Sequence, residues 1–356
     1  MEYSVGIIGG GQAGITIGYY LKKVNIPFII IDKHHRVGES WRNRYESLVL
    51  FTPHQYSVLP GLQMKGLSKK DFPTKDEMAD YLEDYVQHYN IPMMLNTTVD
   101  KLKKEEDGSF FIETNKGRMK TQQVIVASGA FQQGFIPDVT KTHTEAIQLH
   151  SSEYRSPADA SGNEILVVGG GNSGAQIAVE LSKSKNVTIA VSHQFKFLPL
   201  SILGISIFSL LEKTGLLYAG ADTIKGKWFR KQKDPIFGKE LQTLIKNQKI
   251  TVKPRVVQVG DKGVVFEDQT LQKFDSIIWA TGFVPSYEWI QIEHVTHNGK
   301  PVHNRGIADV KGLYFIGLPW QHQRGSALIC GVSKDAEYLA QFITAYYTDY
   351  KKTDCQ

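Results

Sequence analysis

Cysteine is scarce in this chain of 356 residues, which has only Cys330 and Cys355. Two cysteines cannot build a disulfide framework, and these two form neither a Cys-x-x-Cys redox pair nor a thiolate metal cluster. The first residues also lack the basic segment, apolar core and cleavage site of a signal peptide. We therefore expect a cytoplasmic protein whose chemistry does not depend on a thiol pair.

Long apolar runs and a strong charge of one sign are missing as well. The nearest approach to a membrane span is Leu198–Leu211, which serine and glycine interrupt and which falls short of the ~18–20 residues needed. Residues 199–218, which overlap this run, predict a buried helix and loop between domains, although they could also line a substrate entrance or touch a membrane surface. We favour the buried arrangement and do not expect membrane contact. The net charge of +5 comes from scattered basic residues. Such a distribution argues against nucleic acid as a partner and suits small anionic ligands.

Glycine, in contrast, is concentrated in two short turns. The first turn, Gly9–Gly14 (GGGQAG), follows an expected strand at Tyr3–Ile8 and precedes an expected helix at Ile15–Val24. The next strand, Pro27–Ile31, ends at Asp32. In such a βαβ unit the pyrophosphate of a dinucleotide lies on the helix N-terminus, and the acid accepts hydrogen bonds from a ribose diol. Because a carboxylate repels a 2′-phosphate, Asp32 favours FAD or NAD over NADP.

The second turn repeats this pattern. Gly169–Gly174 (GGGNSG) lies between an expected strand at Glu164–Val168 and an expected helix at Ala175–Lys183, and Asn186–Val191 predicts the following strand. One glycine-rich turn is a weak signal, but two in the same context indicate two nucleotide sites. The sequence therefore predicts an α/β protein with two Rossmann-like dinucleotide-binding domains.

The end of the last of these strands decides between NADH and NADPH. Ser192 and His193 occupy the place where an acid would select NAD and an arginine would bind a 2′-phosphate. Together with Lys196 they could hold that phosphate weakly, or all three could be solvated loop residues. We predict that both NADH and NADPH are used.

Two further segments resemble each other, namely Gln123–Gly129 (QVIVASG) and Ser276–Gly282 (SIIWATG). In flavoproteins with two nucleotide domains, such strands mark the places where the chain crosses between domains. We expect an NAD(P)H-binding domain of residues 146–283 to be inserted into an FAD-binding domain of residues 1–145 and 284–356.

Several other elements can be predicted from periodicity and turn residues. Lys75–Tyr89 and Ser333–Thr348 have the apolar spacing of helices. Two hairpins are expected, one formed by residues 99–106 and 109–114 and the other by residues 252–259 and 263–267.

The motifs together carry a family resemblance. Val37–Arg42 (VGESWR), the two glycine turns, the ATGF strand end and residues 317–327 (GLPWQHQRGSA) resemble the flavin-containing monooxygenases, especially their short bacterial branch. The resemblance covers essentially the whole chain. It implies that NAD(P)H reduces FAD, that O2 then forms a C4a-hydroperoxide of the flavin, and that this species oxidises a small sulfide, amine or ketone.

The resemblance also implies which residues contact the cofactors. Gly38, Ser40 and Trp41 would lie along the flavin, although Trp41 could equally be a core residue. The complete set of expected cofactor-binding residues is Gly9, Gly11, Gln12, Ala13, Gly14, Asp32, Lys33, Gly38, Ser40, Trp41, Val99, Ser128, Gly129, Gly169, Gly171, Asn172, Ser173, Gly174, Ser192, His193, Lys196, Thr281, Gly282, Gly317 and Ala327.

Four residues are expected at or near the reaction. Phe51 stands where animal-type members place an asparagine beside the flavin, and a phenyl ring cannot donate a hydrogen bond. His150 and Tyr154 keep the end of the family fingerprint, and His150 is expected to position groups rather than to act as a base. Arg324 would contact the nicotinamide or the oxygenated flavin, or else cap a surface loop.

Two alternatives stay open. A flavoprotein disulfide reductase shares both glycine turns, but it needs redox cysteines, and its bacillithiol type has a cysteine where this chain has Ala13. An NAD(P)H oxidase would release peroxide instead of oxygenating a substrate. The expected partners are a small-molecule substrate, O2 and, as a homodimer, a second copy of the chain.

Overall fold

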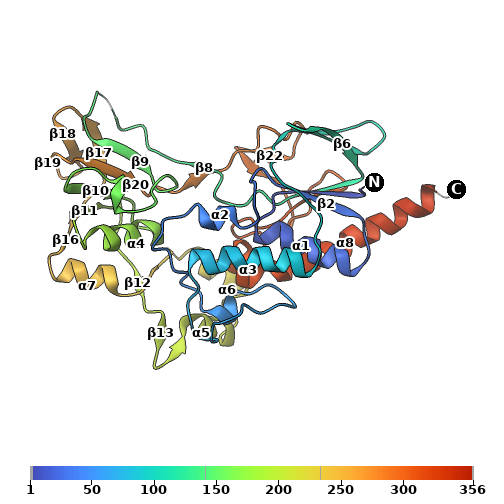
Figure 1. Ribbon diagram of the computed structural model, residues 1–356, viewed down its shortest axis with the longest axis horizontal. Coiled ribbons are helices and arrows are strands. Elements are labelled where there is room, and N and C mark those ends of the chain that lie inside the picture. Colours follow the sequence, from blue (N-terminus) through green and yellow to red (C-terminus); the bar gives the residue numbers. More distant parts are fainter. Residues whose placement is uncertain (1–2, 141, 233, 355–356) are drawn as a thin grey trace.

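The computed structural model describes residues 3–140, 142–232 and 234–354, and it is built around two parallel five-stranded sheets (Figure 1). The first sheet has the order β24-β7-β1-β2-β3, and the second has the order β16-β11-β10-β20-β9. All strand pairs within both sheets are parallel. The predicted α/β class is confirmed.

The first sheet draws its strands from both ends of the chain. Its central strand β1 pairs with β2 on one side and with β7 on the other. The strand bounds are β1 Val5–Ile8, β2 Phe28–Ile31, β3 Met93–Met94, β7 Gln123–Val126 and β24 Leu313–Phe315. These strands are short apolar runs because helices and loops cover both faces of the sheet.

The second sheet is built from residues 147–279 and repeats the same plan. Its central strand β10 pairs with β11 and β20, as β1 pairs with β2 and β7. The strand bounds are β9 Ile147–His150, β10 Glu164–Val168, β11 Asn186–Ala190, β16 Ile250–Lys253 and β20 Ser276–Trp279. The sequence resemblance between residues 123–129 and 276–282 therefore corresponds to equivalent strands.

A three-stranded antiparallel sheet accompanies each half. The first contains β4 Val99–Lys104, β5 Phe110–Thr114 and β6 Gly117–Thr121, so the predicted hairpin at residues 99–114 is confirmed. The second contains β17 Val256–Gly260, β18 Gly263–Phe266 and β19 Leu271–Gln272. The prediction of one strand over residues 252–259 is wrong, because Val252 belongs to β16, and Pro254 interrupts the run before β17.

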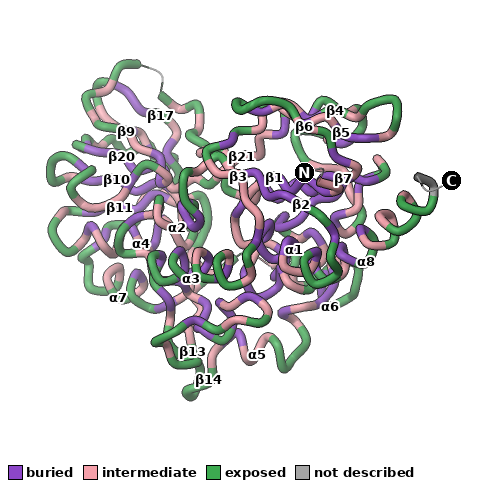
Figure 2. Tube along the Cα trace, turned by 45° about the vertical axis from the view of Figure 1, so that its right-hand side comes forward, coloured by how far each residue is buried: buried purple, intermediate pink, exposed green. Residues whose placement is uncertain are grey.

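Helices pack around the first sheet and form the larger core. α1 (Gln12–Lys23), α3 (Lys75–His88) and α8 (Ile329–Asp354) share one apolar cluster, which includes Leu21, Tyr85 and Leu339. In Figure 2 the buried parts of the chain are concentrated in the two sheets and in the helix faces turned toward them. The predicted helix at residues 75–89 is confirmed, whereas the last helix extends beyond the predicted residues 333–348 at both ends.

The remaining elements are short. They include the helices α2 Glu39–Arg42, α4 Asn172–Leu181, α5 Ile207–Lys213, α6 Ile224–Arg230 and α7 Glu240–Lys246 and the 3-10 turns η1 His54–Tyr56, η2 Pro157–Asp159 and η3 Arg324–Ala327. The two-stranded pairs are β8 Gln133–Gly134 with β21 Phe283–Val284, β12 Phe197–Leu198 with β15 Ile236–Phe237, β13 Ser201–Ile202 with β14 Ile205–Ser206, and β22 Thr296–His297 with β23 Lys300–Pro301.

The chain passes between the two halves through the short pair β8 and β21, and β8 is labelled between the halves in Figure 1. His150 stabilises this crossing. Its Nε2 lies 2.9 Å from the carbonyl oxygen of Gly282, and its Nδ1 lies 2.8 Å from the Ser152 hydroxyl. Since a carbonyl can only accept, Nε2 carries the proton and Nδ1 accepts. Burial lowers the pKa of His150, which favours this neutral form.

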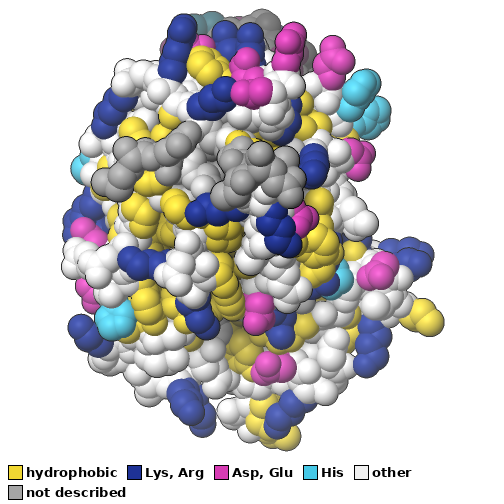
Figure 3. Space-filling view, turned by 90° about the vertical axis from the view of Figure 1, so that its right-hand side faces the viewer, with side chains coloured by type: hydrophobic (Ala, Val, Ile, Leu, Met, Phe, Trp, Pro, Cys, Tyr) yellow, Lys and Arg dark blue, Asp and Glu magenta, His cyan; other side chains and the backbone are white. Residues whose placement is uncertain are grey.

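The apolar stretch 199–218 is only partly buried, so the prediction of a buried helix and loop is wrong for its start. Residues 201–206 form a hairpin with Leu203 98% exposed, while Ile207 and Phe208 at the start of α5 are buried. Within the described residues, no helix is long and apolar enough to cross a membrane. On the face shown in Figure 3, basic and acidic side chains are interspersed.

The glycines of the first turn give a matched test of the packing. A Cβ on Gly14 would lie 1.9 Å from the Gly9 carbonyl oxygen, whereas a Cβ on Gly11 would meet nothing within 4 Å. Gly14→Ala should therefore destabilise the protein by about 2–3 kcal/mol through overpacking, and Gly11→Ala by less than about 1 kcal/mol. The thermal unfolding midpoint, followed by circular dichroism, measures both; equal shifts would refute the packing argument.

Candidate functional site

A large cavity of about 1160 Å³ lies between the two halves of the molecule. Its wall contains the first glycine turn, the end of β2, the segment from residue 36 to residue 52, and the first turn of α4. The carboxyl ends of the parallel strands in open α/β sheets are the usual place for ligands. The volume exceeds that of an ordinary small-molecule pocket, which is at most about 1,000 Å³.

The first turn presents its helix N-terminus to this cavity. Gly9 has a φ of +112°, and a Cβ there would lie 2.5 Å from the Ala127 carbonyl oxygen, so only glycine fits. Gly11 is the N-cap of α1 and makes no side-chain cap hydrogen bond. The free N–H groups of the first helical turn and the open space at Gly11 fit a pyrophosphate.

Asp32 lies at the end of β2 and faces the same cavity. Its Oδ2 accepts a hydrogen bond of 2.5 Å from the Gly10 N–H, and its Oδ1 accepts from the N–H and the ring of His34, at 2.8 and 2.9 Å. Burial opposes the charged form, but these hydrogen bonds outweigh it and hold the pKa of Asp32 below its ordinary value. The carboxylate is thus charged and able to accept from a ribose.

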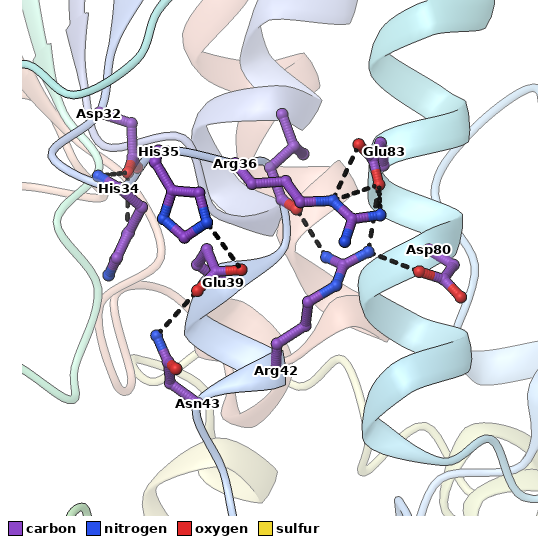
Figure 4. Close-up of polar contacts among 10 residues, drawn as sticks. Asp32, His34, His35, Arg36, Glu39, Arg42, Asn43, Asp80 and Glu83 are labelled. Atoms are coloured by element: carbon purple, nitrogen blue, oxygen red, sulfur yellow. Dashed lines mark hydrogen bonds and ion pairs between the residues drawn. The ribbon is translucent and has the colours of Figure 1, made fainter.

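Residues 36–43 reach the cavity because ion pairs fix them to α3 (Figure 4). Arg42 donates to Asp80 at 2.5 Å and to Glu83 at 3.1 Å, and Arg36 donates to Glu83 at 2.7 Å. Gly38 has a φ of +84°, and a Cβ there would lie 2.6 Å from the Ala79 carbonyl oxygen. Glycine and these arginines therefore bring the VGESWR segment close against α3.

Most residues expected to bind the first cofactor line the cavity. They are Gly9, Gly11, Gln12, Ala13, Asp32, Lys33, Gly38, Ser40, Trp41, Val99, Ser128, Gly129, Gly317 and Ala327. Gly14 does not, because it packs α1 against the strand end. Trp41 is half-buried, lines the cavity and also packs against the apolar core of the first half, so a contact with the cofactor and a packing role both stay open.

The second turn repeats the geometry of the first. Gly169 has a φ of +125°, a Cβ on Gly174 would lie 2.2 Å from the Gly169 carbonyl oxygen, and a Cβ on Gly171 would meet nothing within 4 Å. Asn172 and Ser173 of α4 line the cavity, whereas the three glycines do not. The side chain of Asn172 is not free for a phosphate, because it contacts the Pro235 carbonyl and the Phe237 N–H.

The residues expected at the far end of the second nucleotide lie outside the cavity wall. Ser192 and His193 form an exposed bend after β11, and Lys196 contacts Gln232 at 3.3 Å. Thr281 and Gly282 belong to the crossing, where Thr281 donates to the Phe135 carbonyl and Gly282 accepts from His150.

Of the four residues expected near the reaction, only Phe51 lines the cavity. Its ring stacks on Phe237, with centroids 4.6 Å apart. Tyr154 is fully buried and donates to Glu180 at 2.8 Å, and His150 is buried at the crossing. Arg324 forms an ion pair of 2.9 Å with Asp234.

Several cavity residues were not predicted from the sequence. Arg44, Tyr45, Phe131, Arg155, Gln176 and Phe283 all line the cavity. They come from loops, from α4 and from β21, and only the tertiary structure brings them together. The described residues contain no cluster of three or more His, Cys, Asp or Glu side chains suited to a metal ion.

Comparisons with known proteins agree with this geometry. Residues 6–197 match the pyridine nucleotide-disulphide oxidoreductase family, and residues 221–305 match the flavin-binding monooxygenase-like family. An uncharacterized oxidoreductase, described as CzcO-like, from Geobacillus kaustophilus is 50% identical over 94% of this chain and 96% of its own length. A probable indole-3-pyruvate monooxygenase of Arabidopsis thaliana is 27% identical over 96% of this chain and 90% of its own length.

A solved structure is similar over the same extent. The flavin-containing monooxygenase from Stenotrophomonas maltophilia has a TM-score of 0.81 and 26% identity, and the match covers 97% of this chain and 99% of that one. The two glycine turns, the acid after β2 and the shared cavity agree with such an enzyme. The chain therefore belongs to the bacterial flavin-binding monooxygenase-like family, and it is an FAD-dependent monooxygenase with NADPH as reductant.

Proposed function

We propose that FAD binds along the first glycine turn, that the nicotinamide dinucleotide binds at the second, and that the enzyme oxygenates a small sulfide, amine or ketone with O2. The observation that carries this proposal is that two open helix N-termini are close to one cavity large enough for both cofactors. We assign residues 1–145 and 284–356 to the FAD-binding domain and residues 146–283 to the NAD(P)H-binding domain, in agreement with the membership of the two parallel sheets.

Bound FAD supplies hydride acceptance from NADPH and the activation of O2. The protein's own part is to orient the cofactors and exclude water. Phe51, stacked on Phe237, gives the cavity an apolar wall with no hydrogen-bond donor at that point. Ile329, the first residue of the 26-residue helix α8, also lines the cavity, so the positive end of the helix dipole favours negative charge there.

His150 and Tyr154 act in this proposal as positioning residues. His150 connects the strand end of the second sheet to the crossing, and Tyr154 connects the following loop to α4 through Glu180. The Arg324–Asp234 ion pair must open, or its loop must shift, before Arg324 can reach a cofactor. Homodimer formation and a cytoplasmic location remain predictions from the sequence.

The fate of oxygen tests the proposed reaction. The holoenzyme is supplied with NADPH, a panel of sulfides, amines and ketones, and ¹⁸O-labelled O2. We expect one labelled oxygen atom in a product of the panel and less hydrogen peroxide than NADPH consumed. An NAD(P)H oxidase would instead convert nearly all NADPH equivalents into peroxide without labelled product.

Asp32 provides a test of the FAD site. Asp32→Asn removes the negative charge that accepts from the ribose, so the FAD dissociation constant of the apoprotein should rise at least ~10-fold. Flavin fluorescence quenching measures it. Asp107→Asn is the matched control, because that exposed carboxylate also accepts from a backbone N–H but lies on the β4–β5 turn outside the cavity. Equal effects of the two variants would refute the assignment.

The bend after β11 provides a test of nicotinamide selectivity. The wild-type ratio of kcat/KM for NADPH over NADH should lie within about 100-fold of unity, because neither an acid nor an arginine follows the strand. Ser192→Arg should raise the ratio about 10-fold by pairing with the 2′-phosphate. Ser192→Gln adds length without charge and should leave it nearly unchanged; a rise of the same size in both variants would count against a charge effect.

A further inference from the structure

Arg44 is the cavity cation whose surroundings need an explanation. It follows α2 and lies at the wall between the two halves. Its guanidinium lies over the rings of Phe131 and Phe283, at 4.7 and 5.5 Å from their centroids. Phe283 belongs to β21 of the crossing pair, and Phe131 lies two residues before β8. The two rings stand edge to face with centroids 5.1 Å apart, so both lie on the same side of the guanidinium, and its other side can donate hydrogen bonds.

No described residue neutralises this charge. The neighbouring Arg36 and Arg42 are paired with acids, whereas Arg44 makes no ion pair or side-chain hydrogen bond within the described ranges. Burial lowers the pKa of Arg44, and the nearby Arg155 adds to this effect. Arg155 also lacks an acidic partner for its side chain in the described part of the chain, and donates to the carbonyls of Ser152 and Tyr154. Two partly buried cations without a counterion are costly unless an anion joins them.

Arg44 is held near the first turn of α4. Tyr45, the next residue, is buried and donates to Gln176 of α4 at 2.7 Å, and Gln176 donates to the Val49 carbonyl at 3.2 Å. Ser173 and Gln176 line the cavity together with Arg44 and Arg155. A phosphate at the N-terminus of α4 would thus have two arginines on the opposing wall.

We propose that Arg44, with Arg155, binds the pyrophosphate of the nicotinamide dinucleotide from the side opposite α4. This inference rests on the proposed placement of that cofactor at the second glycine turn. Arg44 belongs to the half that binds FAD, so the contact would fix the reductant against the flavin-binding half. A guanidinium fork matches a pyrophosphate better than a lysine does, because it can donate two parallel hydrogen bonds.

The test measures binding to the oxidised, FAD-loaded enzyme by isothermal titration calorimetry, with NADP⁺ and NAD⁺ as probes. Arg44→Met keeps an unbranched apolar side chain against the two rings and removes the charge. We expect it to weaken both probes by a similar factor of at least ~10, and Arg44→Lys to weaken them by less. Arg118→Met, which removes an exposed arginine of β6 paired with Glu113, should bind both probes like the wild type.

Each other outcome has a defined meaning. If Arg44→Met weakens NADP⁺ binding but not NAD⁺ binding, Arg44 contacts the 2′-phosphate. If the variant has a lower ratio of FAD to protein and binds NADP⁺ as the wild type does, Arg44 contacts FAD. Either result overturns the proposal. Unchanged binding of both probes, with a raised KM only for a substrate bearing a carboxylate, would overturn it in favour of a substrate contact. If the wild-type enzyme binds neither NADP⁺ nor NAD⁺, the proposed function itself fails. That result is seen without the Arg44 variants, so it is distinguishable from a failure of the Arg44 proposal.

Discussion

The close approach of a helix to a strand end, made possible by glycine, is the constraint on which both halves of the molecule depend. In the first turn a Cβ on Gly14 would lie 1.9 Å from the Gly9 oxygen, and in the second a Cβ on Gly174 would lie 2.2 Å from the Gly169 oxygen. Removing two side chains brings the helix N-terminus directly over the strand end. The middle glycine of each turn then leaves open space beside uncapped N–H groups, which is what a phosphate requires.

The charges around the cavity follow from the same requirement. One acid, Asp32, is kept ionised at the end of β2 by hydrogen bonds that do not use all of its acceptor capacity. On the opposite side, Arg44 and Arg155 have no acid among their described partners. Arg36 and Arg42 differ from them, because both pair with Glu83. The charges left over are of the signs that a ribose diol and a pyrophosphate would match.

The sequence predicted the parts of the site that depend on local backbone geometry. These parts are short-range sequence patterns, namely the turns at residues 9–14 and 169–174, Asp32 and the VGESWR segment. In the structure, most residues expected to bind the first cofactor line one cavity. Side-chain roles set by distant segments were not predictable. Nothing near Asn172 indicates that its amide would contact residues 235 and 237, and nothing near Arg324 indicates its pairing with Asp234. The role of Arg44 was not predicted for the same reason, because the aromatic rings that its guanidinium contacts belong to residues 131 and 283.

The shared fold with pyridine nucleotide-disulphide oxidoreductases does not bring their thiol chemistry with it. Ala13 is buried, and a Cβ on Gly317 would lie 2.8 Å from the Ala13 side chain, so larger side chains at these two positions would compete for one space. Cys330 is the free cysteine of the described residues; it is buried, does not line the large cavity, and burial raises its pKa to about 12. A thiol in that state is a poor nucleophile. The large cavity instead has an apolar aromatic wall at Phe51. In a site of this kind the bound cofactor carries out the chemistry, and the protein excludes water from it.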